Sequence, residues 1–490
     1  GTKSSRAATN GKTARGKDPI NLATGEVVDD WTDLTIGGTL PLVLTRYFRS
    51  GFRDGISFGP SQASMLDMRL EVGVDGVLFI GEDGSVQEFD GHPSDDGAEI
   101  LPPYANTPLS FVDGAYRVRD VPLGITYEFA LFGDKASVSA AAIAPESSLA
   151  GVTDSSVSVW LSAVVHRTGH RIEVEYDQRT GRPRALHHSG GATVHIDADA
   201  ATGRVMGLAV SDAQTDMTTV SLYEYSANGD MTAHYDSTGV PFRYTWDHDH
   251  RMTSWTDRVG TSYHYVYDLA GRIAMQGGSR GIYPLAAVHL DDLGTDAPEG
   301  GTVMVTIEPV TDLAPAEEGD TRIGERFARL DALPVVKALA SGGLTAVGLD
   351  TGGRAGDADR DNPVAWADVA SPDLTEDPVL GRIHAWVYRS NAAGQLWRIV
   401  SPEGVVTDFD RDSRHNLVKR VDGDGSTLRW EVDEFGCTSA SIGPDGSVSR
   451  VEYAPLGVPV KHVDASGRVT EIELDDMGNI TSVEGPDGAR

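Results

Sequence analysis

A 21-residue period in the glycines of the last hundred residues is the feature that most constrains the fold. One series runs Gly404, Gly425, Gly446, Gly467 and Gly488. A second series with the same spacing runs Gly394, His415, Gly436, Gly457 and Gly478. Apolar residues alternate with polar ones between the two series, as in Val451-Glu-Tyr. Two turns per 21 residues, joined by alternating segments, predict one β-hairpin per repeat.

The composition suits a β protein with many turns and excludes several classes of partner. The chain has 490 residues, 56 glycines and a formal net charge of −32. A nucleic-acid partner is not expected, because phosphate binding needs a basic surface. Membrane insertion is not expected either, since no apolar run approaches the ~18 residues of a membrane span. Cys437, the single cysteine, excludes internal disulfides and is interpreted as a small core residue rather than a nucleophile.

The first 17 residues differ in composition from the rest. They hold five basic residues and no acidic one, so residues 1–17 are interpreted as a disordered basic tail. Gly11-Lys12-Thr13 is not a phosphate-binding loop, because Arg6 stands where that motif needs a glycine. The chain begins with Gly1, shows no signal-type apolar core and stops inside a repeat. We therefore expect it to be a piece of a longer protein.

Residues 18–90 are predicted to form an N-terminal β module. Short apolar segments such as Leu40-Pro-Leu-Val-Leu are separated by glycine and proline. Gly55-Ile-Ser-Phe-Gly59 matches the nucleophile-elbow pattern, which requires a strand before the serine and a helix after it. Here a loop precedes Ser57 and Gly-Pro follows the motif, so we expect an ordinary loop.

Residues 91–165 are predicted to form a β meander and a loop. The meander pattern begins near residue 60, where Asp75-Gly76 and Asp83-Gly84 each separate two apolar segments, and it continues through Asp113-Gly114 to about residue 140. Asp-Gly in that position favours a hairpin with positive φ at both central residues. The segment 137–155, rich in Ala and Ser, is interpreted as the loop.

Two stretches, residues 166–290 and residues 381–490, follow the 21-residue period. The recurring unit of the first stretch is a Tyr-Asp pair, a short turn, Gly-Arg and an apolar strand. Each turn glycine is expected to supply positive φ. The repeat-defining residues are Tyr176, Asp177, Gly181, Arg182, Tyr267, Asp268, Gly271 and Arg272 in the first stretch and Gly425, Gly446 and Gly467 in the second.

Residues 291–380 interrupt the period and are interpreted as a small α+β insertion on the rim of the repeat array. Thr302-Val-Met-Val-Thr-Ile is a strand candidate. Four apolar residues recur at nearly helical spacing and predict a helix, followed by loops rich in Gly, Asp and Pro. They are Ile323, Phe327, Leu330 and Leu333.

The Tyr-Asp…Gly-Arg units resemble those of the Rhs/YD-repeat family. Tyr176-Asp177…Gly181-Arg182 and Tyr267-Asp268…Gly271-Arg272 match its signature. Asp18-Pro-Ile-Asn-Leu-Ala-Thr-Gly25 and Leu40-Pro-Leu-Val-Leu-Thr-Arg-Tyr47 are similar to the N-terminal module of bacterial Rhs proteins. The resemblance covers most of residues 18–290 and 381–490. It implies a hollow β-shell that encapsulates a C-terminal polypeptide, often a toxin.

The physics of long sheets leads to a similar expectation. About ten repeats at ~4.8 Å per strand would form a ribbon of roughly 100 Å if flat, and such sheets curl because their strands twist. We therefore predict an all-β fold in which antiparallel β-hairpin repeats form a curled or spiral sheet. The tyrosine of each unit is expected to pack on its counterpart one repeat away.

Glu431, Glu452 and Glu473 form an acidic row at 21-residue spacing, on the face opposite the apolar residues that precede them. The favoured interpretation is a solvated face. The alternative is a lining that holds a basic or partly unfolded cargo.

No catalytic constellation is recognisable, and neither a cofactor nor a metal site is predicted. His248 and His250 share a turn but lack a nearby cysteine or spaced carboxylates, which disfavours a metal site. Asp357-Ala-Asp-Arg-Asp-Asn362 alternates acids but lacks the Gly and Glu of an EF-hand loop, so a solvated loop is favoured. The resembling family has a self-cleaving segment after its last repeat, and this stretch contains neither that segment nor a toxin region. We therefore expect no enzymatic activity here.

The resemblance supports two functional hypotheses from different classes. In the first, the chain is the N-terminal part of an Rhs-type shell, and its partner is its own C-terminal toxin cargo encoded downstream. In the second, it is an extracellular or cell-wall-associated adhesion or glycan-binding protein. Both imply a secreted or cell-surface location, with secretion machinery or cell-wall components as further partners. A hydrolase is a third, disfavoured class.

Overall fold

The computed structural model describes most of the chain. No helix in the described part is both long and apolar enough to cross a membrane. The basic tail, the loop of residues 137–155 and the acidic segment of residues 357–362 lie outside the described residues. The described ranges are 20–94, 97–103, 105–130, 157–212, 215–278, 285–292, 302–309, 323–346, 376–377, 381–454, 457–475 and 480–488.

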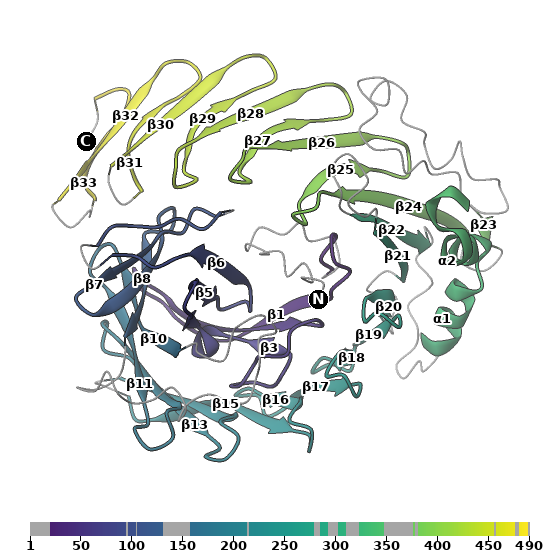
Figure 1. The fold of residues 1–490 in the computed structure, drawn as a ribbon, viewed down its shortest axis with the longest axis horizontal. Coiled ribbons are helices and arrows are strands. Elements are labelled where there is room, and N and C mark those ends of the chain that lie inside the picture. The colour runs from purple at the N-terminus through teal and green to yellow at the C-terminus, as the bar shows by residue number, and fades with distance from the viewer. Residues whose placement is uncertain are drawn as a thin grey trace.

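An N-terminal module of three antiparallel strands lies inside the curve of a much longer sheet (Figure 1). Its elements are β1 (Val28–Ile36), β2 (Leu42–Arg49), β3 (Gln62–Ala63) and a 3-10 turn, η1 (Met65–Asp67). Alternate residues of β2 are fully buried, and they include Leu42, Leu44 and Arg46. Because successive strand residues point to opposite faces, one face of β2 is entirely inside the protein.

Two short meanders connect the module to the long sheet through the same strand, β10 (Val157–His166). The first half of β10 pairs with β4 and the second half with β9. Asp113 and Gly114 have φ of 54° and 80°, which confirms the predicted two-residue hairpin there. The meander strands are β4 (Arg69–Val72), β5 (Gly76–Ile80), β6 (Val86–Asp90), β7 (Leu109–Val112), β8 (Ala115–Asp120) and β9 (Ile125–Ala130).

The other two Asp-Gly pairs separate strands as predicted, but with different turns. At Asp83-Gly84 only the glycine has positive φ, 71°. Gly76 begins β5 instead of completing a two-residue turn. The dipeptide therefore marks the hairpin, while the neighbouring residues decide the turn type.

The first repeat block, residues 171–278, consists of five antiparallel hairpins. A register shift recurs where each Tyr-Asp unit begins, as at Tyr176 and Tyr267. Such a β-bulge beside a glycine turn increases the local twist. The strands are β11 (Arg171–Tyr176), β12 (Pro183–His188), β13 (Thr193–Ala198), β14 (Val205–Ser211), β15 (Thr218–Tyr225), β16 (Met231–Tyr235), β17 (Pro241–Trp246), β18 (Met252–Thr256), β19 (Ser262–Tyr267) and β20 (Ile273–Gly278).

The second repeat block, residues 381–484, continues the same pattern with bulges at Val432 and Tyr453. The strands between and within the blocks are β21 (Ala286–Asp292), β22 (Thr302–Pro309), β23 (Glu376–Asp377), β24 (Gly381–Ser390), β25 (Leu396–Val400), β26 (Val406–Arg411), β27 (Leu417–Val421), β28 (Thr427–Val432), β29 (Thr438–Ile442), β30 (Val448–Ala454), β31 (Val458–Val463), β32 (Val469–Leu474) and β33 (Ile480–Glu484).

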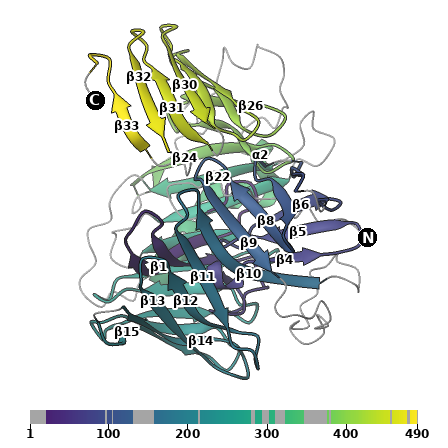
Figure 2. The ribbon, with the colours of Figure 1, turned by 90° about the vertical axis from the view of Figure 1, so that its left-hand side faces the viewer.

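The long sheet curls without closing. Among the described strands, no ladder joins β33 back to β4 or β7. In Figure 2 the second block lies above the meander strands, so the ribbon rises as it curls. The predicted all-β fold of antiparallel hairpins in a curled sheet is therefore confirmed.

The predicted helix forms, and a second helix that was not predicted follows it. In α1 (Ile323–Asp331), Phe327 and Leu330 are buried as their spacing suggests. α2 (Pro334–Ala346) follows after two residues. Helix α2 was not predicted because glycines in its interior have low helix propensity. The proline at its first position, however, favours helix initiation.

The helices cover the outer face of the sheet, away from the N-terminal module. Val303, Val305 and Ile307 of β22 pack with α1 and α2 in a second core, whereas Met304 points into the main core. β22 also pairs with β21 and β24, so this part of the interruption belongs to the sheet itself and not to its rim. The outer face of β22 is apolar, whereas its inner face carries Thr302 and Thr306 on either side of Met304.

Candidate functional site

The turn of the repeat unit is built by its aspartate and its glycine. The Asp177 carboxylate accepts hydrogen bonds from the backbone N–H groups of Arg179 and Thr180, at 3.0 and 2.8 Å. The Gly181 N–H bonds to the Asp177 carbonyl at 2.7 Å, and Gly181 has φ of 67°. The bonds from Thr180 hold the pKa of Asp177 below its ordinary value. Aspartate thus satisfies the turn donors while glycine provides the left-handed backbone.

Arg182, Arg204 and Arg251 each contact the glycine of the next turn along the rim. A methyl group at Gly203 would lie 2.6 Å from Nε of Arg182, and one at Gly229 would lie 2.1 Å from an Nη of Arg204. Arg204 also donates to the Gly229 carbonyl at 2.7 Å. Glycine therefore provides the φ, and a side chain in its place would also displace the guanidinium of the preceding arginine.

Asp268, Gly271 and Arg272 form an equivalent turn at the end of the first block. Asp268 accepts from the Arg272 N–H at 2.9 Å, and its carboxylate also pairs with the Arg272 guanidinium. Gly271 has φ of 81°. Arg272 therefore stabilises its own turn through both its backbone N–H and its guanidinium.

The tyrosine of each unit is bonded to the preceding repeat through its hydroxyl. Tyr176 donates to the Leu161 carbonyl at 2.7 Å, and Tyr267 donates to the Met252 carbonyl at 2.8 Å. Both acceptors lie 15 residues upstream. The repeats are thus joined by a hydroxyl–carbonyl hydrogen bond, where the spacing had predicted ring-on-ring packing.

The two rims of the ribbon differ in what touches them. We call the rim that carries residues 177–182, 268–272 and 412–416 the docked rim, and the opposite rim the free rim. Gly425, Gly446 and Gly467 lie on the free rim with φ of 80–82°, and no neighbouring atom lies within 4 Å of the place of a Cβ. These three glycines serve turn geometry alone.

Residues of the N-terminal third contact the docked rim in both blocks. The Ser57 carbonyl accepts from the Val205 N–H at 2.8 Å, and the Ser61 hydroxyl donates to the His250 carbonyl at 2.6 Å. Farther along, Asn106 donates to the Asn416 side-chain carbonyl at 2.7 Å. Successive turns are therefore fastened to the part of the chain that precedes the repeats.

A buried ion pair within the module bonds to tyrosines on the inner face of the first block. Arg46 and Asp33 have fully buried side chains and form two bonds, at 2.6 and 2.9 Å. Burial opposes the charge of Arg46, but Asp33 and its neighbours raise the Arg46 pKa well above its ordinary value. Four aromatic rings surround the guanidinium carbon at 5.6–5.9 Å, namely Trp31, Phe58, Tyr223 and Tyr244.

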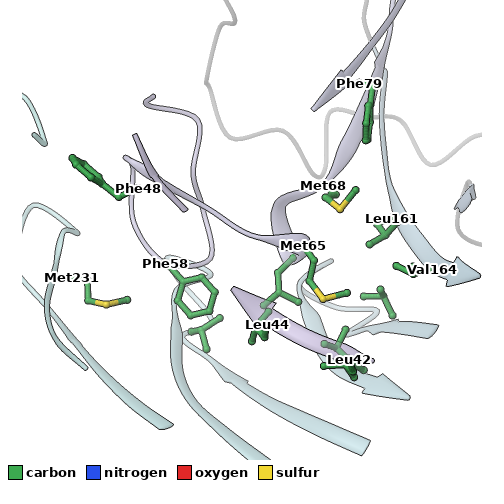
Figure 3. Close-up of a cluster of buried hydrophobic side chains, with 14 of the residues drawn as sticks. Leu42, Leu44, Phe48, Phe58, Met65, Met68, Phe79, Leu161, Val164 and Met231 are labelled. Carbon is green, nitrogen blue, oxygen red and sulfur yellow. The ribbon is translucent and has the colours of Figure 1, made fainter. Parts of the chain in front are cut away.

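Apolar side chains complete this junction. Figure 3 shows Phe58 of the module between Leu44 and the repeat residue Met231. The hydroxyl of Tyr223 donates to Asp33 at 2.7 Å, which adds a third bond to the buried carboxylate. Sequence reasoning missed the pair, although Arg46 stands at an inward position of the alternating strand that contains Leu42 and Leu44.

The inner face of the second block is less covered. Phe409 packs against the main core, and the register carries the same face of the sheet to Trp430, Val451 and Ile472. These three are half-buried and lie outside both cores. On β33, at the end of this face, Val483 is 44% exposed.

The acidic row lies on the outer face, so the cargo-lining interpretation of it is wrong. Glu431, Glu452 and Glu473 alternate with the inward residues and are exposed. Glu431 pairs with Arg450 at 3.2 Å, and Glu452 lies 3.9 Å from Lys461. The outer face is thus a solvated surface of mixed charge, in which such pairs contribute little.

Other residues singled out in the sequence have structural surroundings. His250 bonds to Asp230 at 2.7 Å, whereas the His248 side chain is 87% exposed. Within the described ranges no group of three or more His, Cys, Asp or Glu residues could hold a metal. Cys437 is buried, and Ser57 lies in a loop where its N–H bonds to Asp67.

The fold and the turns define a class, that of β-hairpin repeat proteins with a curled sheet. Residues 391–427 match the RHS Repeat family model, and residues 17–89 match a domain of unknown function, DUF6531. The first match places an RHS repeat within the second block and agrees with the resemblance of the Tyr-Asp turns to the Rhs/YD-repeat family. No curated protein matches the sequence.

Several solved structures are similar to the chain at low identity. TcdB2-TccC3-Cdc42 aligns with a TM-score of 0.30 and 10% identity, over 92% of this chain and 23% of that one. TcdB2-TccC3 aligns with a TM-score of 0.28 and 11% identity, over 99% and 25%. The N-terminal domain of the effector SpvB from Salmonella typhimurium strain LT2 aligns with a TM-score of 0.21 and 12% identity, over 53% of this chain and 94% of that one. The chain spans about a quarter of the first two.

Proposed function

We propose that the chain forms part of the wall of a shell that encloses a polypeptide cargo, the C-terminal toxin or effector region of a longer secreted protein. The observation that carries the proposal is the change along one inner face. In the first block that face is covered by the module, so that Tyr244 is only 4% exposed. In the second block its equivalents Trp430 and Val451 are half-buried and outside the cores.

The chemistry of this inner face suits a polypeptide without a fixed fold. Rows of apolar residues alternate with a polar row that contains Arg420, Ser441 and His462. Apolar side chains bind any exposed hydrophobic segment, while the polar row satisfies backbone groups without demanding one sequence. The outer face carries paired charges and remains solvated. We further propose that this stretch is structural and holds no active site of its own.

Site-specific photo-crosslinking in the full-length protein tests this proposal. A benzophenone amino acid placed at Trp430 or Val451 points inward, and the same residue at Glu431 or Glu452 provides the matched outward control. We expect crosslinks from the inward positions to the region that follows the repeats, mapped by mass spectrometry, and none from the outward positions.

The same experiment can contradict the proposal. Equal crosslinking from both faces, or none from the inward positions to any cargo region, would show that the inner face does not enclose polypeptide. Benzophenone at Tyr244 is the internal standard, because the module covers this position and should capture the crosslink.

A further inference from the structure

The row of turns on the docked rim contains an interruption. Repeat turns with this backbone geometry follow one another up to residues 268–272, and the next described repeat turn on this rim is formed by residues 391–395. β21 and β22 lie between these turns, and the sequence that connects them lacks the Tyr-Asp…Gly-Arg pattern. Arg182, Arg204 and Arg251 each lie against the glycine of the next turn, so the question is which described glycine lies beside Arg272.

Residues 21–26 have the geometry of a repeat turn although they precede the repeats. Asn21 accepts from the N–H groups of Ala23 and Thr24 at 3.0 and 3.3 Å, and the Gly25 N–H bonds to the Asn21 carbonyl at 2.9 Å. Gly25 has φ of 70°.

The turn of residues 199–204 shows the same bonds. Asp199 accepts from the N–H groups of Ala201 and Thr202 at 3.2 and 2.8 Å, and the Gly203 N–H bonds to the Asp199 carbonyl at 2.8 Å. The sequences agree as well, since Asn-Leu-Ala-Thr-Gly stands beside Asp-Ala-Ala-Thr-Gly. Asparagine replaces aspartate with the same acceptor geometry.

This N-terminal turn is the glycine partner of Arg272. A methyl group at Gly25 would lie 3.1 Å from the Cβ of Arg272 and 3.3 Å from Leu290. The Ile273 N–H donates to the Gly25 carbonyl at 2.9 Å. Gly25 thus lies beside Arg272, but against the stem of that side chain, whereas Gly203 and Gly229 lie against the guanidinium groups of Arg182 and Arg204.

The other side of the turn reaches the strands that follow the interruption. The Thr302 hydroxyl donates to the Ala23 carbonyl at 2.9 Å. The Ala23 methyl group lies 3.6 Å from the place of a Cβ on Gly394, in the first turn of the second block. Asn21 and Leu22 are only 2% and 3% exposed, so the turn is seated in a socket from which Thr24 faces solvent.

We propose that residues 21–26 act as a surrogate repeat turn that splices the two repeat blocks across the interruption. The socket is formed by Arg272, Ile273, Thr302 and Gly394, and its ligand is an Asx-x-x-Thr-Gly turn, supplied here by the chain's own N-terminal module. The splice fixes how the second block follows the first. This inference does not depend on the enclosure of a cargo.

Amide hydrogen exchange of the whole chain, read out by mass spectrometry, tests the splice. Asn21→Ala removes the side-chain acceptor of the turn, so we expect exchange at least ten-fold faster in the peptides that contain Ile273 and Gly394. Asn21→Asp restores the residue of a true repeat turn and should leave both peptides as protected as in the wild type. Asp199→Ala, the matched control, should accelerate exchange around residues 199–204 and leave Ile273 unchanged.

Two outcomes would overturn the inference. One is unchanged protection of Ile273 in Asn21→Ala, and the other is equal damage by Asn21→Asp and Asn21→Ala. If Asn21→Ala exchanges rapidly throughout the chain, the milder Thr24→Ala decides, because it removes only the hydroxyl that accepts from the Glu26 N–H. Faster exchange confined to both socket peptides supports the splice, and any other pattern contradicts it.

Discussion

The two repeat blocks share one period and one turn chemistry, yet they differ in what lies against their inner face. Tyr223 and Tyr244 of the first block are 2% and 4% exposed beneath the N-terminal module. Their counterparts in the second block are Phe409 and Trp430, and both are half-buried. Phe409 still packs against the main core, whereas Trp430 lies outside it. The repeat thus determines the path of the backbone, while burial depends on a segment outside the repeat. Stability is therefore expected to be unequal along the sheet.

Removal of the buried carboxylate of Asp33 should reduce stability the most, and the loss should be concentrated in the first block. Asp33→Ala leaves the Arg46 guanidinium buried without a counter-charge, so we expect a loss of about 3–5 kcal/mol in the free energy of unfolding. Urea unfolding, followed by hydrogen exchange of each block, measures it. The double variant Asp33→Leu/Arg46→Met removes both charges and should recover most of the loss. A loss below about 1 kcal/mol in Asp33→Ala would show that the ion pair does not fasten the module.

Alanine in place of a turn glycine should cost more stability on the docked rim than on the free rim. Gly203→Ala forces a side chain into a left-handed residue and against Arg182, whereas Gly446→Ala meets open space at nearly the same φ. We expect about 2–3 kcal/mol for the first and about 1–2 kcal/mol for the second, since only backbone strain is common to both. Equal losses measured by thermal unfolding would mean that the arginine contact carries no energy.

The buried carboxyl of Glu82, between β5 and β6, should make the free energy of unfolding depend on pH. Burial and Asp83 raise the pKa of Glu82 to about 7 from its ordinary 4.5. Between these values the unfolded chain releases the proton while the folded chain keeps it, so stability falls as pH rises through this window, by at most about 3 kcal/mol. Glu82→Gln should abolish this contribution, seen as the difference between variant and wild-type unfolding free energies at each pH.

The difference measurement is needed because His234 acts in the opposite direction. Burial lowers its pKa to about 4 from 6.5, so its contribution to stability increases as pH rises across that range. Glu452→Gln, on the exposed outer face, is the matched control. A pH profile that is parallel in Glu82→Gln and wild type would show that the pKa of Glu82 is the same in the folded and the unfolded chain.

The smallest expected effect concerns the tyrosine hydroxyl that joins successive repeats. Tyr267→Phe removes the bond to the Met252 carbonyl beside the main core and should cost about 1 kcal/mol. Tyr453→Phe removes the equivalent bond to the Thr438 carbonyl, outside the core, and should cost less because water can replace it. The reverse order, measured by urea unfolding, would contradict the unequal burial of the two blocks.

The sequence allowed the repeated part of the fold to be predicted, because each turn is specified locally. Asp177 and Gly181 determine their turn without reference to distant residues, and the 21-residue period then orders the hairpins. The strand at Thr302 and the helix at Phe327 were also recognisable, since their apolar spacing is regular. A curled sheet followed from the twist of any long ribbon.

The contacts between distant segments could not be predicted in the same way. Arg46 donates to the hydroxyl of Tyr244, 198 residues away, and the local sequence around either residue gives no indication of this contact. The direction of Glu452 depends on which face of the sheet the module covers, which the period leaves open. The likeness of residues 21–26 to a repeat turn was present in the sequence, but the strand pattern after Gly25 differs from that of a repeat.

The freedom of one rim has a consequence for how such a chain can be lengthened. No neighbouring atom lies within 4 Å of the place of a Cβ on Gly446 or Gly467, so extra sequence can leave and re-enter the sheet there without displacing a partner. The connection from β22 to β24, which includes both helices, departs from this same side. Tags, reporter domains or further modules should therefore be tolerated at the free rim, whereas a single inserted residue at 199–204 would break the link to the module.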